Sequence, residues 1–306
     1  MGADPPRFPY QMTGKTQGPV ILSQHHAGLL DEFLIERAES SLILLANSRS
    51  AGLDDRGGLF EGTYAAYLED GSITGVAAHF WNGMVFLQAP ENPAVLVSAA
   101  LAASGRGCTG ISGPYGQVQE ALPELLKKKT VPILNSRNTL FSLVLDSLAV
   151  PALLREGAVT CRLPSDTEVP TLIGMRIAFL QEHLGRPPAP SLQDEARELV
   201  TWQQQTGNHW VLETAGTLVA TTAVNTGVPG MVQVGGVYTL PGYRNKGYGR
   251  AVVAGSLLTL RERGVKKAIL FTGQNMPEAE TMYRALGFRP IGESGLVLFQ
   301  TNRKDH

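Results

Sequence analysis

The sequence has little of the chemistry that marks secreted, metal-binding or membrane proteins. Among its 306 residues only two are cysteines, Cys108 and Cys161, which lie far apart and lack the spacing of metal ligands. We therefore expect both thiols to be buried and unreactive in a reducing compartment. No apolar run reaches the length of about 18 residues that a membrane-spanning helix needs. These features predict a cytoplasmic protein without a membrane partner.

An excess of one charge is also missing. The chain carries 26 Lys and Arg residues against 27 Asp and Glu residues, a formal net charge of −1. Such a balance creates no overall field that would attract nucleic acid, so we expect no nucleic-acid partner. The HExxH, CxxC and GxSxG motifs and a carboxylate triad are absent as well. We therefore expect no metal and no serine nucleophile.

One stretch combines a strand, a glycine-bearing turn and a helix. From Val232 to Arg250 it reads VQVGGVYTLPGYRNKGYGR, and an apolar helical pattern follows. Backbone N–H groups at a helix N-terminus, together with the helix dipole, can hold a pyrophosphate. Gly247 and Gly249 suit this task, because a Cβ at either position would keep the ligand's oxygens away from the backbone.

The spacing fits neither a nucleotide P-loop nor a dinucleotide fingerprint. It resembles the acyl-CoA motif of the GNAT superfamily of N-acyltransferases, with Pro241, Tyr243 and Arg244 before the two glycines. A second series follows in the order of that superfamily: Asn275, Ala279, Tyr283 and Gly287-Phe288. Within the superfamily, the segment GVYTLPGYRNKGYG looks closest to the glycine N-acyltransferase-like branch.

The order of predicted elements agrees with this resemblance. After a strand at Arg162, the second half gives two helices, three strands, the glycine turn, a helix, a strand, a helix and a strand. The predicted segments are helices 175–184, 192–205, 248–263 and 277–286 and strands 209–214, 218–224, 231–238 and 268–272. The resemblance implies an α/β fold of the α+β type, a mixed sheet that splays at its centre with helices on both faces.

The first half repeats this pattern. A helix is predicted over Ala27–Leu45, followed by strands 64–69, 73–80 and 84–88 and a helix from Ala94. Met84 matches Met231 at an offset of 147, whereas Ala94 matches Ala251 at an offset of 157. The first half therefore lacks about ten residues where the second half has its glycine turn. We predict two tandem GNAT-like domains, a degenerate domain over residues 1–150 without the CoA loop and a catalytic domain over residues 151–306.

The resemblance implies that acetyl-CoA, or another acyl-CoA, is the co-substrate. Its predicted binding residues are Val237, Tyr238, Thr239, Arg244, Asn245, Lys246, Gly247, Tyr248, Gly249, Arg250 and Asn275. Less specific readings stay open for several of them. The strand residues could belong to an ordinary sheet, Lys246 and Arg250 could be solvated, and Asn275 could cap a helix.

Tyr283 is by resemblance the general acid that protonates the departing CoA thiolate. A phenol pKa near 10 keeps the hydroxyl protonated at neutral pH, although a half-buried core tyrosine is the simpler reading. Where some relatives carry a glutamate as general base, this chain has Gln233, which cannot take a proton but can orient a water. Glu213 and His209 are possible substitutes, and a water relay is preferred.

These residues predict an acyl-CoA-dependent N-acetyltransferase that transfers an acyl group directly to a primary amine in a ternary complex. The expected acceptor is a small molecule or an amino acid, and the expected state is a monomer or homodimer. Two alternatives remain: a non-catalytic acyl-CoA sensor, favoured by the missing carboxylate at Gln233, and a protein lysine acetyltransferase.

Overall fold

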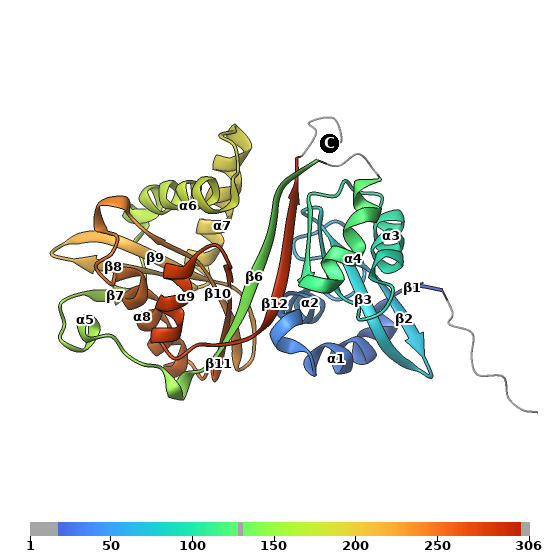
Figure 1. Ribbon diagram of the computed structural model, residues 1–306, viewed down its shortest axis with the longest axis horizontal. Coiled ribbons are helices and arrows are strands. Elements are labelled where there is room, and N and C mark those ends of the chain that lie inside the picture. The colour runs from blue at the N-terminus through green and yellow to red at the C-terminus, as the bar shows by residue number, and fades with distance from the viewer. Residues whose placement is uncertain (1–17, 128–130, 301–306) are drawn as a thin grey trace, which may run out of the picture.

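The computed structural model describes residues 18–127 and 131–300, which form two lobes on either side of two long central strands (Figure 1). The strands are β1 Val20–Ile21, β2 Gly62–Glu69, β3 Ser72–Phe80, β4 Met84–Gln88, β5 Gly110–Pro114, β6 Pro132–Val144, β7 Thr160–Arg162, β8 His209–Thr214, β9 Thr217–Val228, β10 Met231–Thr239, β11 Lys267–Gly273 and β12 Arg289–Phe299. The α-helices are α1 Ala27–Ile35, α2 Ala38–Ala51, α3 Pro93–Ser104, α4 Tyr115–Leu126, α5 Ala152–Arg155, α6 Val169–Leu184, α7 Pro190–Gln205, α8 Tyr248–Glu262 and α9 Pro277–Ala285. Short 3₁₀ helices are η1 Gln24–His26, η2 Leu145–Ser147, η3 Asp166–Glu168 and η4 Pro241–Tyr243.

All of these strands join one mixed sheet in the order β1-β2-β3-β4-β5-β12-β6-β11-β10-β9-β8-β7. The pairs β4/β5 and β10/β11 are parallel, and the other neighbours are antiparallel. Each parallel pair is connected through a helix, α3 or α8, as a parallel connection requires. The predicted fold class, a mixed sheet with helices on both faces, is confirmed.

Successive side chains of β8 point to opposite faces of the sheet, and helices cover both faces in the second lobe. Trp210 and Leu212 pack into the core beneath α8, whereas Val211 packs with α6 and α7 on the opposite face. A strand with apolar residues at successive positions is typical of a sheet that is buried on both sides. In the first lobe, α3 and α4 cover one face and α1 and α2 the other.

Each of the two central strands, β6 and β12, pairs with strands from the other half of the chain. β12, the last strand, lies between β5 and β6, with Leu296 opposite both Ser112 and Ser136. β6, which precedes residue 150, pairs with β11 along its length, from Lys267 opposite Val144 to Gly273 opposite Asn138. A chain cut at residue 150 therefore separates β6 from the strands that flank it. The division into domains 1–150 and 151–306 stays a prediction about the folding units, and residues 1–17 and 301–306 of it lie outside the described residues.

Strand registers in the two lobes agree with the ten-residue difference. Met84 of β4 lies opposite Gly110, 26 positions on, and Met231 of β10 lies opposite Lys267, 36 positions on. β4 and α3 are joined by only four residues, whereas eight residues join β10 to α8. The connection thus accounts for four of the ten residues, and β4, with five residues against nine in β10, accounts for four more.

One predicted element is wrong in its extent. The apolar pattern over Ala27–Leu45 predicted a single helix, but α1 ends at Ile35 and α2 begins at Ala38. The break falls at Arg37, whose backbone is non-helical (φ −117°, ψ 22°) and whose guanidinium donates to the Phe33 carbonyl at 2.9 Å. An apolar periodicity continues across such a break because both helices bury the same side.

The described ranges are residues 18–127 and 131–300. Within them no helix has both the length and the apolar character to cross a membrane. The same ranges hold no group of three or more His, Cys, Asp or Glu side chains placed to share a metal ion.

Candidate functional site

The parallel strands β10 and β11 separate halfway along their length. They pair only from Met231 to Gln233 of β10, opposite residues 267–269 of β11. Beyond that point β11 keeps its other neighbour, β6, and β10 keeps β9. The side of β10 that faces β11 therefore has no strand partner over residues 234–239. The predicted residues Val237, Tyr238 and Thr239 lie in this unpaired part.

A β-bulge lies in the same part of β10. Gly235 pairs with Ala223 and Tyr238 with Thr221, so three steps on β10 match two on β9. Gly236, with φ of 61°, adopts the left-handed conformation that glycine tolerates best. A bulge of this kind re-aims the strand and exposes backbone groups, and bulges are frequent next to binding sites.

Residues 241–250, which we call the glycine loop, connect the unpaired end of β10 to α8. Asn245 (φ 63°) and Gly247 (φ 81°) both adopt left-handed conformations and turn the chain into the helix. The first backbone bond of α8 runs from the Ala251 N–H to the Gly247 carbonyl at 3.0 Å. The N–H groups of residues 248–250 precede that bond and have no acceptor within the helix. N–H groups placed in this way can bind an anion, and the pyrophosphate site at them stays a prediction.

Three elements meet at Gly249. A methyl group added there would lie 3.2 Å from the Met282 sulfur of α9 and 3.4 Å from the Thr239 hydroxyl of β10. The strand end, the first turn of α8 and the helix that carries Tyr283 are therefore in direct contact. At Gly247 a Cβ would make only an ordinary contact, 3.4 Å from the Leu153 side chain, so this glycine is required mainly for its left-handed backbone conformation.

Tyr283 lies in the core beneath this junction and is only 7% exposed. Its ring packs against those of Phe141 and Phe288, with centroids 6.2 and 5.9 Å away. Burial raises the pKa of the phenol above its usual value, so the hydroxyl stays protonated at neutral pH. None of the described residues accepts or donates a hydrogen bond at this hydroxyl. The buried Tyr64 hydroxyl of the first lobe also lacks a partner among the described residues, so this feature alone assigns no role to Tyr283.

The candidate bases lie in different surroundings. Gln233 is buried in the paired part of β10, opposite Ile269, and not in the unpaired part. Glu213 accepts from Arg162 at 2.6 Å near the β7 edge of the sheet, which explains its presence structurally. His209 is buried and its Nε2 lies 2.6 Å from the Thr221 hydroxyl. Burial, and then the charge of Arg176, lowers the pKa of His209 to about 4, so it is a weak base.

The remaining predicted residues lie along the same edge. Lys246 is exposed and lies over the Tyr243 ring at 5.5 Å, whereas the Arg250 Nε is buried and has no hydrogen-bond partner among the described residues. Asn275 is exposed beside the end of β11, and its side chain does not cap α9, whose N-cap is Met276. The capping explanation for Asn275 is therefore wrong.

Arg244 is held by a residue that the sequence did not single out. Its Nη2 donates to Glu182 of α6 at 2.7 Å, and its Nε donates to the Thr239 carbonyl at 3.0 Å. The Tyr238 hydroxyl donates to the other oxygen of Glu182 at 2.7 Å. These two hydrogen bonds, Tyr238 first, lower the pKa of Glu182. Glu182 thus fixes the start of the glycine loop onto α6, and the Arg244 side chain is already occupied.

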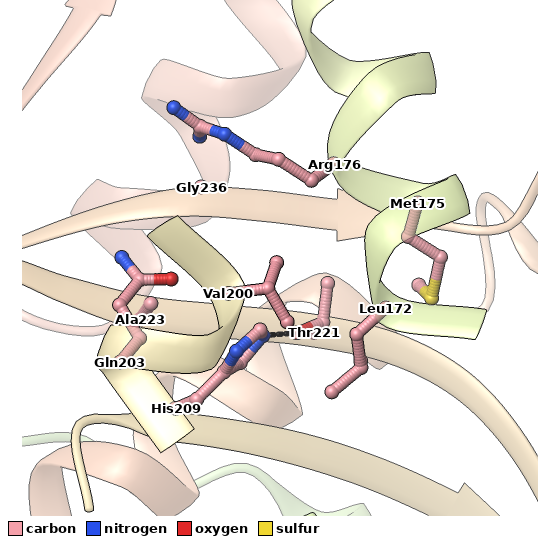
Figure 2. Close-up of a pocket in the computed structure, with 9 residues that line it drawn as sticks. All are labelled: Leu172, Met175, Arg176, Val200, Gln203, His209, Thr221, Ala223 and Gly236. Atoms are coloured by element: carbon pink, nitrogen blue, oxygen red, sulfur yellow. Dashed lines mark hydrogen bonds between the residues drawn. The ribbon is translucent and has the colours of Figure 1, made fainter. Parts of the chain in front are cut away.

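A second missed residue is Arg176, also on α6. Its guanidinium lies beside the bulge at Gly236, as Figure 2 shows. The sequence did contain a signal for it, since Arg176 is the only charged residue in the run from Val169 to Leu180. A single charge in an otherwise uncharged, partly buried stretch of a helix indicates a specific role.

The matching position in the first lobe is closed. The Leu87 carbonyl lies so near Gly113 that a methyl group there would come within 2.6 Å of it, so β4 and β5 stay together beyond their paired residues. The N–H of Ala89, where β4 leads into α3, donates to the Gln117 side chain at 2.7 Å. A cofactor arm would therefore find neither a gap between strands nor a free N–H at this point.

Comparison with known proteins adds the fold family. Residues 177–288 match the model of the acetyltransferase (GNAT) family. The structure is similar to that of a Drosophila protein, with a TM-score of 0.63 and 14% identity over 92% of this chain and 98% of that one. It is also similar to a GCN5-related N-acetyltransferase from Sphaerobacter thermophilus (TM-score 0.57, 14% identity, 91% and 94% covered). A third similar structure is a tandem GNAT protein from the clavulanic acid biosynthesis pathway (TM-score 0.54, 15% identity, 92% and 97% covered). No curated protein matches the sequence. The chain therefore has a GNAT fold and resembles a tandem GNAT protein over most of its length.

Proposed function

We propose that this protein is an acetyl-CoA-dependent N-acetyltransferase that acts on a primary amine, with its site in the second lobe. One observation carries the proposal: the unpaired part of β10, the free N–H groups of the glycine loop and the helix of Tyr283 meet at Gly249. The strand would hold the extended arm of the co-substrate through its free backbone groups. The loop would hold the pyrophosphate.

In the proposed reaction, the amine nitrogen attacks the thioester carbonyl, and a C–N bond forms as the C–S bond breaks. The sulfur leaves with the proton of the Tyr283 hydroxyl, which water then restores. The amine loses its own proton to a water. A water relay suits this site better than a protein base, because Gln233 cannot take a proton and His209 holds one only weakly.

The sensor alternative would keep the loop but not the chemistry. The Tyr283 hydroxyl favours the enzyme over the sensor, because it has no hydrogen-bond partner among the described residues and is free to donate its proton to a departing thiolate. Protein lysine acetylation and membership of the glycine N-acyltransferase-like branch have no specific support among the contacts described above.

The test combines titration calorimetry with turnover. We expect acetyl-CoA to bind at one site per chain, because the first lobe offers no gap between β4 and β5. Thiol release is then followed with a panel of primary amines, which includes amino acids, polyamines and lysine peptides. Binding without thiol release for any amine would favour the sensor, two sites per chain would contradict the closed first lobe, and no binding would refute the proposal.

A further inference from the structure

The guanidinium of Arg176 has no counter-ion in the part of the chain that the structure describes. Arg176 is partly buried on α6, and none of the described residues forms a hydrogen bond or ion pair with it. Its Nε is sealed from solvent without a partner. The carboxylate that acts on it most, Glu195, is itself bound to Arg186 at 2.9 Å. Burial lowers the pKa of Arg176 to about 10, which still leaves it cationic at neutral pH.

An unpaired charge in such a place is costly for folding. Partly buried charged groups are normally paired and hydrogen-bonded, because desolvation penalises them otherwise. The neighbours of Arg176 do not compensate, since Leu172 and Met175 are apolar and His209 is neutral. The Phe179 ring, 5.1 Å from the guanidinium carbon, provides only a cation–π contact. Across residues 18–127 and 131–300, this cation therefore has no anionic partner.

The position of this cation relates it to the proposed reaction. A methyl group added at Gly236 would lie 3.5 Å from Nη1 of Arg176, so the guanidinium lies against the bulge of β10. Figure 2 shows it extending over the strand at Gly236 and away from His209. The cavity that Arg176 lines with His209 and Thr221 has a volume of about 10 Å³, room for roughly one water. A ligand must therefore reach the guanidinium from its solvent side.

We infer that Arg176 binds the carboxylate of the amine acceptor, so that the acceptors are amino acids and other primary amines that carry a carboxylate. This inference rests on the proposed function, because it uses β10 as the strand along which the acyl donor lies. A carboxylate matches the planar fork of a guanidinium through two parallel hydrogen bonds. The pyrophosphate of the donor has its own site in the glycine loop, which leaves Arg176 for the acceptor.

The experiment measures acceptor binding directly, by calorimetry on the full-length protein saturated with CoA, which cannot be turned over. Each amino acid in the panel is compared with its α-amide and its decarboxylated amine. With Arg176→Gln, the affinity for the acids should fall by about twentyfold or more, the usual effect of losing a charge-assisted hydrogen bond, and the amides should be unaffected. Arg176→Lys should give an intermediate loss. Arg197→Gln, which changes an exposed arginine of α7 that has no ion pair among the described residues, is the matched control.

Thermal stability gives a second readout. Removing an uncompensated charge should leave the melting temperature of Arg176→Gln equal to or above that of the wild type, whereas a structural arginine would leave a less stable protein. The inference is wrong if Arg176→Gln binds the acids as tightly as the wild type, if it melts lower, or if only amides, sulfonates or phosphate-bearing amines bind. Failure of CoA to bind would count against the proposed function alone, because the panel can then be titrated against the free protein.

Discussion

At the scale of single residues, removal of the Tyr283 hydroxyl can show whether the protein is an enzyme or a binding protein. Because the hydroxyl has no hydrogen-bond partner among residues 18–127 and 131–300, Tyr283→Phe removes no hydrogen bond between these residues. We expect turnover to fall by about a hundredfold or more, the lower end of general acid catalysis. Acetyl-CoA affinity and melting temperature should hardly change.

The control for this variant is Tyr238→Phe, which removes a hydroxyl that does have a partner, Glu182. Loss of that bond should destabilise the protein by about 1 kcal/mol. Equal turnover in wild type and Tyr283→Phe would remove the phenol from the mechanism, whatever the melting temperatures.

Residues of the site were predictable from the sequence where the signal is local. The glycines and Arg244 have fixed spacings along one strand–turn–helix unit, Tyr283 follows on α9, and the structure brings that unit and α9 into contact at Gly249. Glu182 and Arg176 could not be found in this way, because α6 lies some 60 residues before the loop it contacts. Their roles depend on how α6 packs across β10, which no spacing within the chain specifies.

At the scale of elements, the glycine loop should depend on the absence of a side chain at Gly249. In Gly249→Val the Cβ would lie only 3.2 Å from the Met282 sulfur and 3.4 Å from the Thr239 hydroxyl, so its two methyl groups would crowd these side chains. The valine side chain would also block the approach of a ligand to the first turn of α8. We expect the dissociation constant for acetyl-CoA to rise more than tenfold.

Gly242→Val is the matched control, since this glycine lies in the same loop with no atom within 4 Å of an added Cβ. It should bind acetyl-CoA as the wild type does. If both variants bind equally well, the glycine loop is not the pyrophosphate site.

The corner between β7 and η3 should make stability depend on acid pH. Glu168 accepts from Arg162 at 2.8 Å and from the Ser165 N–H at 2.7 Å, and the Arg162 bond is the main cause that lowers its pKa from 4.5 to about 2. A carboxyl whose pKa is lower in the folded state stabilises it above pH 4.5, and that contribution disappears as the pH falls towards 2.

Glu168→Gln should therefore melt below the wild type at pH 7, and the two melting curves should converge by pH 2–3. Glu156→Gln, an exposed glutamate without an ion pair among the described residues, should match the wild type throughout. A difference for Glu168→Gln that stays constant from pH 7 to pH 2 would show that the pair does not titrate in this way.

The ends of some helices and strands could be predicted from the periodicity of apolar residues alone, and others could not. β4 and β8 begin and end at the predicted residues, because alternating apolar positions and clear turns delimit them. The break at Arg37 was missed, since apolar residues recur at helical spacing on both sides of it. The places of β6 and β12 in the sheet could not be predicted from the sequence either, because strand order is decided by contacts between distant segments.

At the scale of the whole molecule, the exchange of β6 and β12 should make the two halves inseparable. A fragment of residues 151–306 would lack β6, which fills the space between β11 and β12. Both strands would then expose unpaired edges, and we expect the fragment to aggregate or to melt without cooperativity.

Co-expression of residues 1–150 with residues 151–306 should restore a stable pair. The cut falls between η2 and α5, outside every strand, and leaves all the pairings of the sheet possible. Size-exclusion chromatography and circular dichroism would test both statements. A cooperative melt of residues 151–306 alone, at the temperature of the full chain, would contradict them.

The place of β12 also determines when the chain can finish folding during its synthesis. β5 is complete at Pro114, but the strand that covers its edge ends at Phe299. At about 5–20 residues per second, a ribosome needs roughly 10–40 s to make the residues in between. Through that interval the nascent first lobe exposes an uncovered strand edge. Slow translation, or a chain that stops before β12, therefore leaves an aggregation-prone intermediate that chaperones must bind.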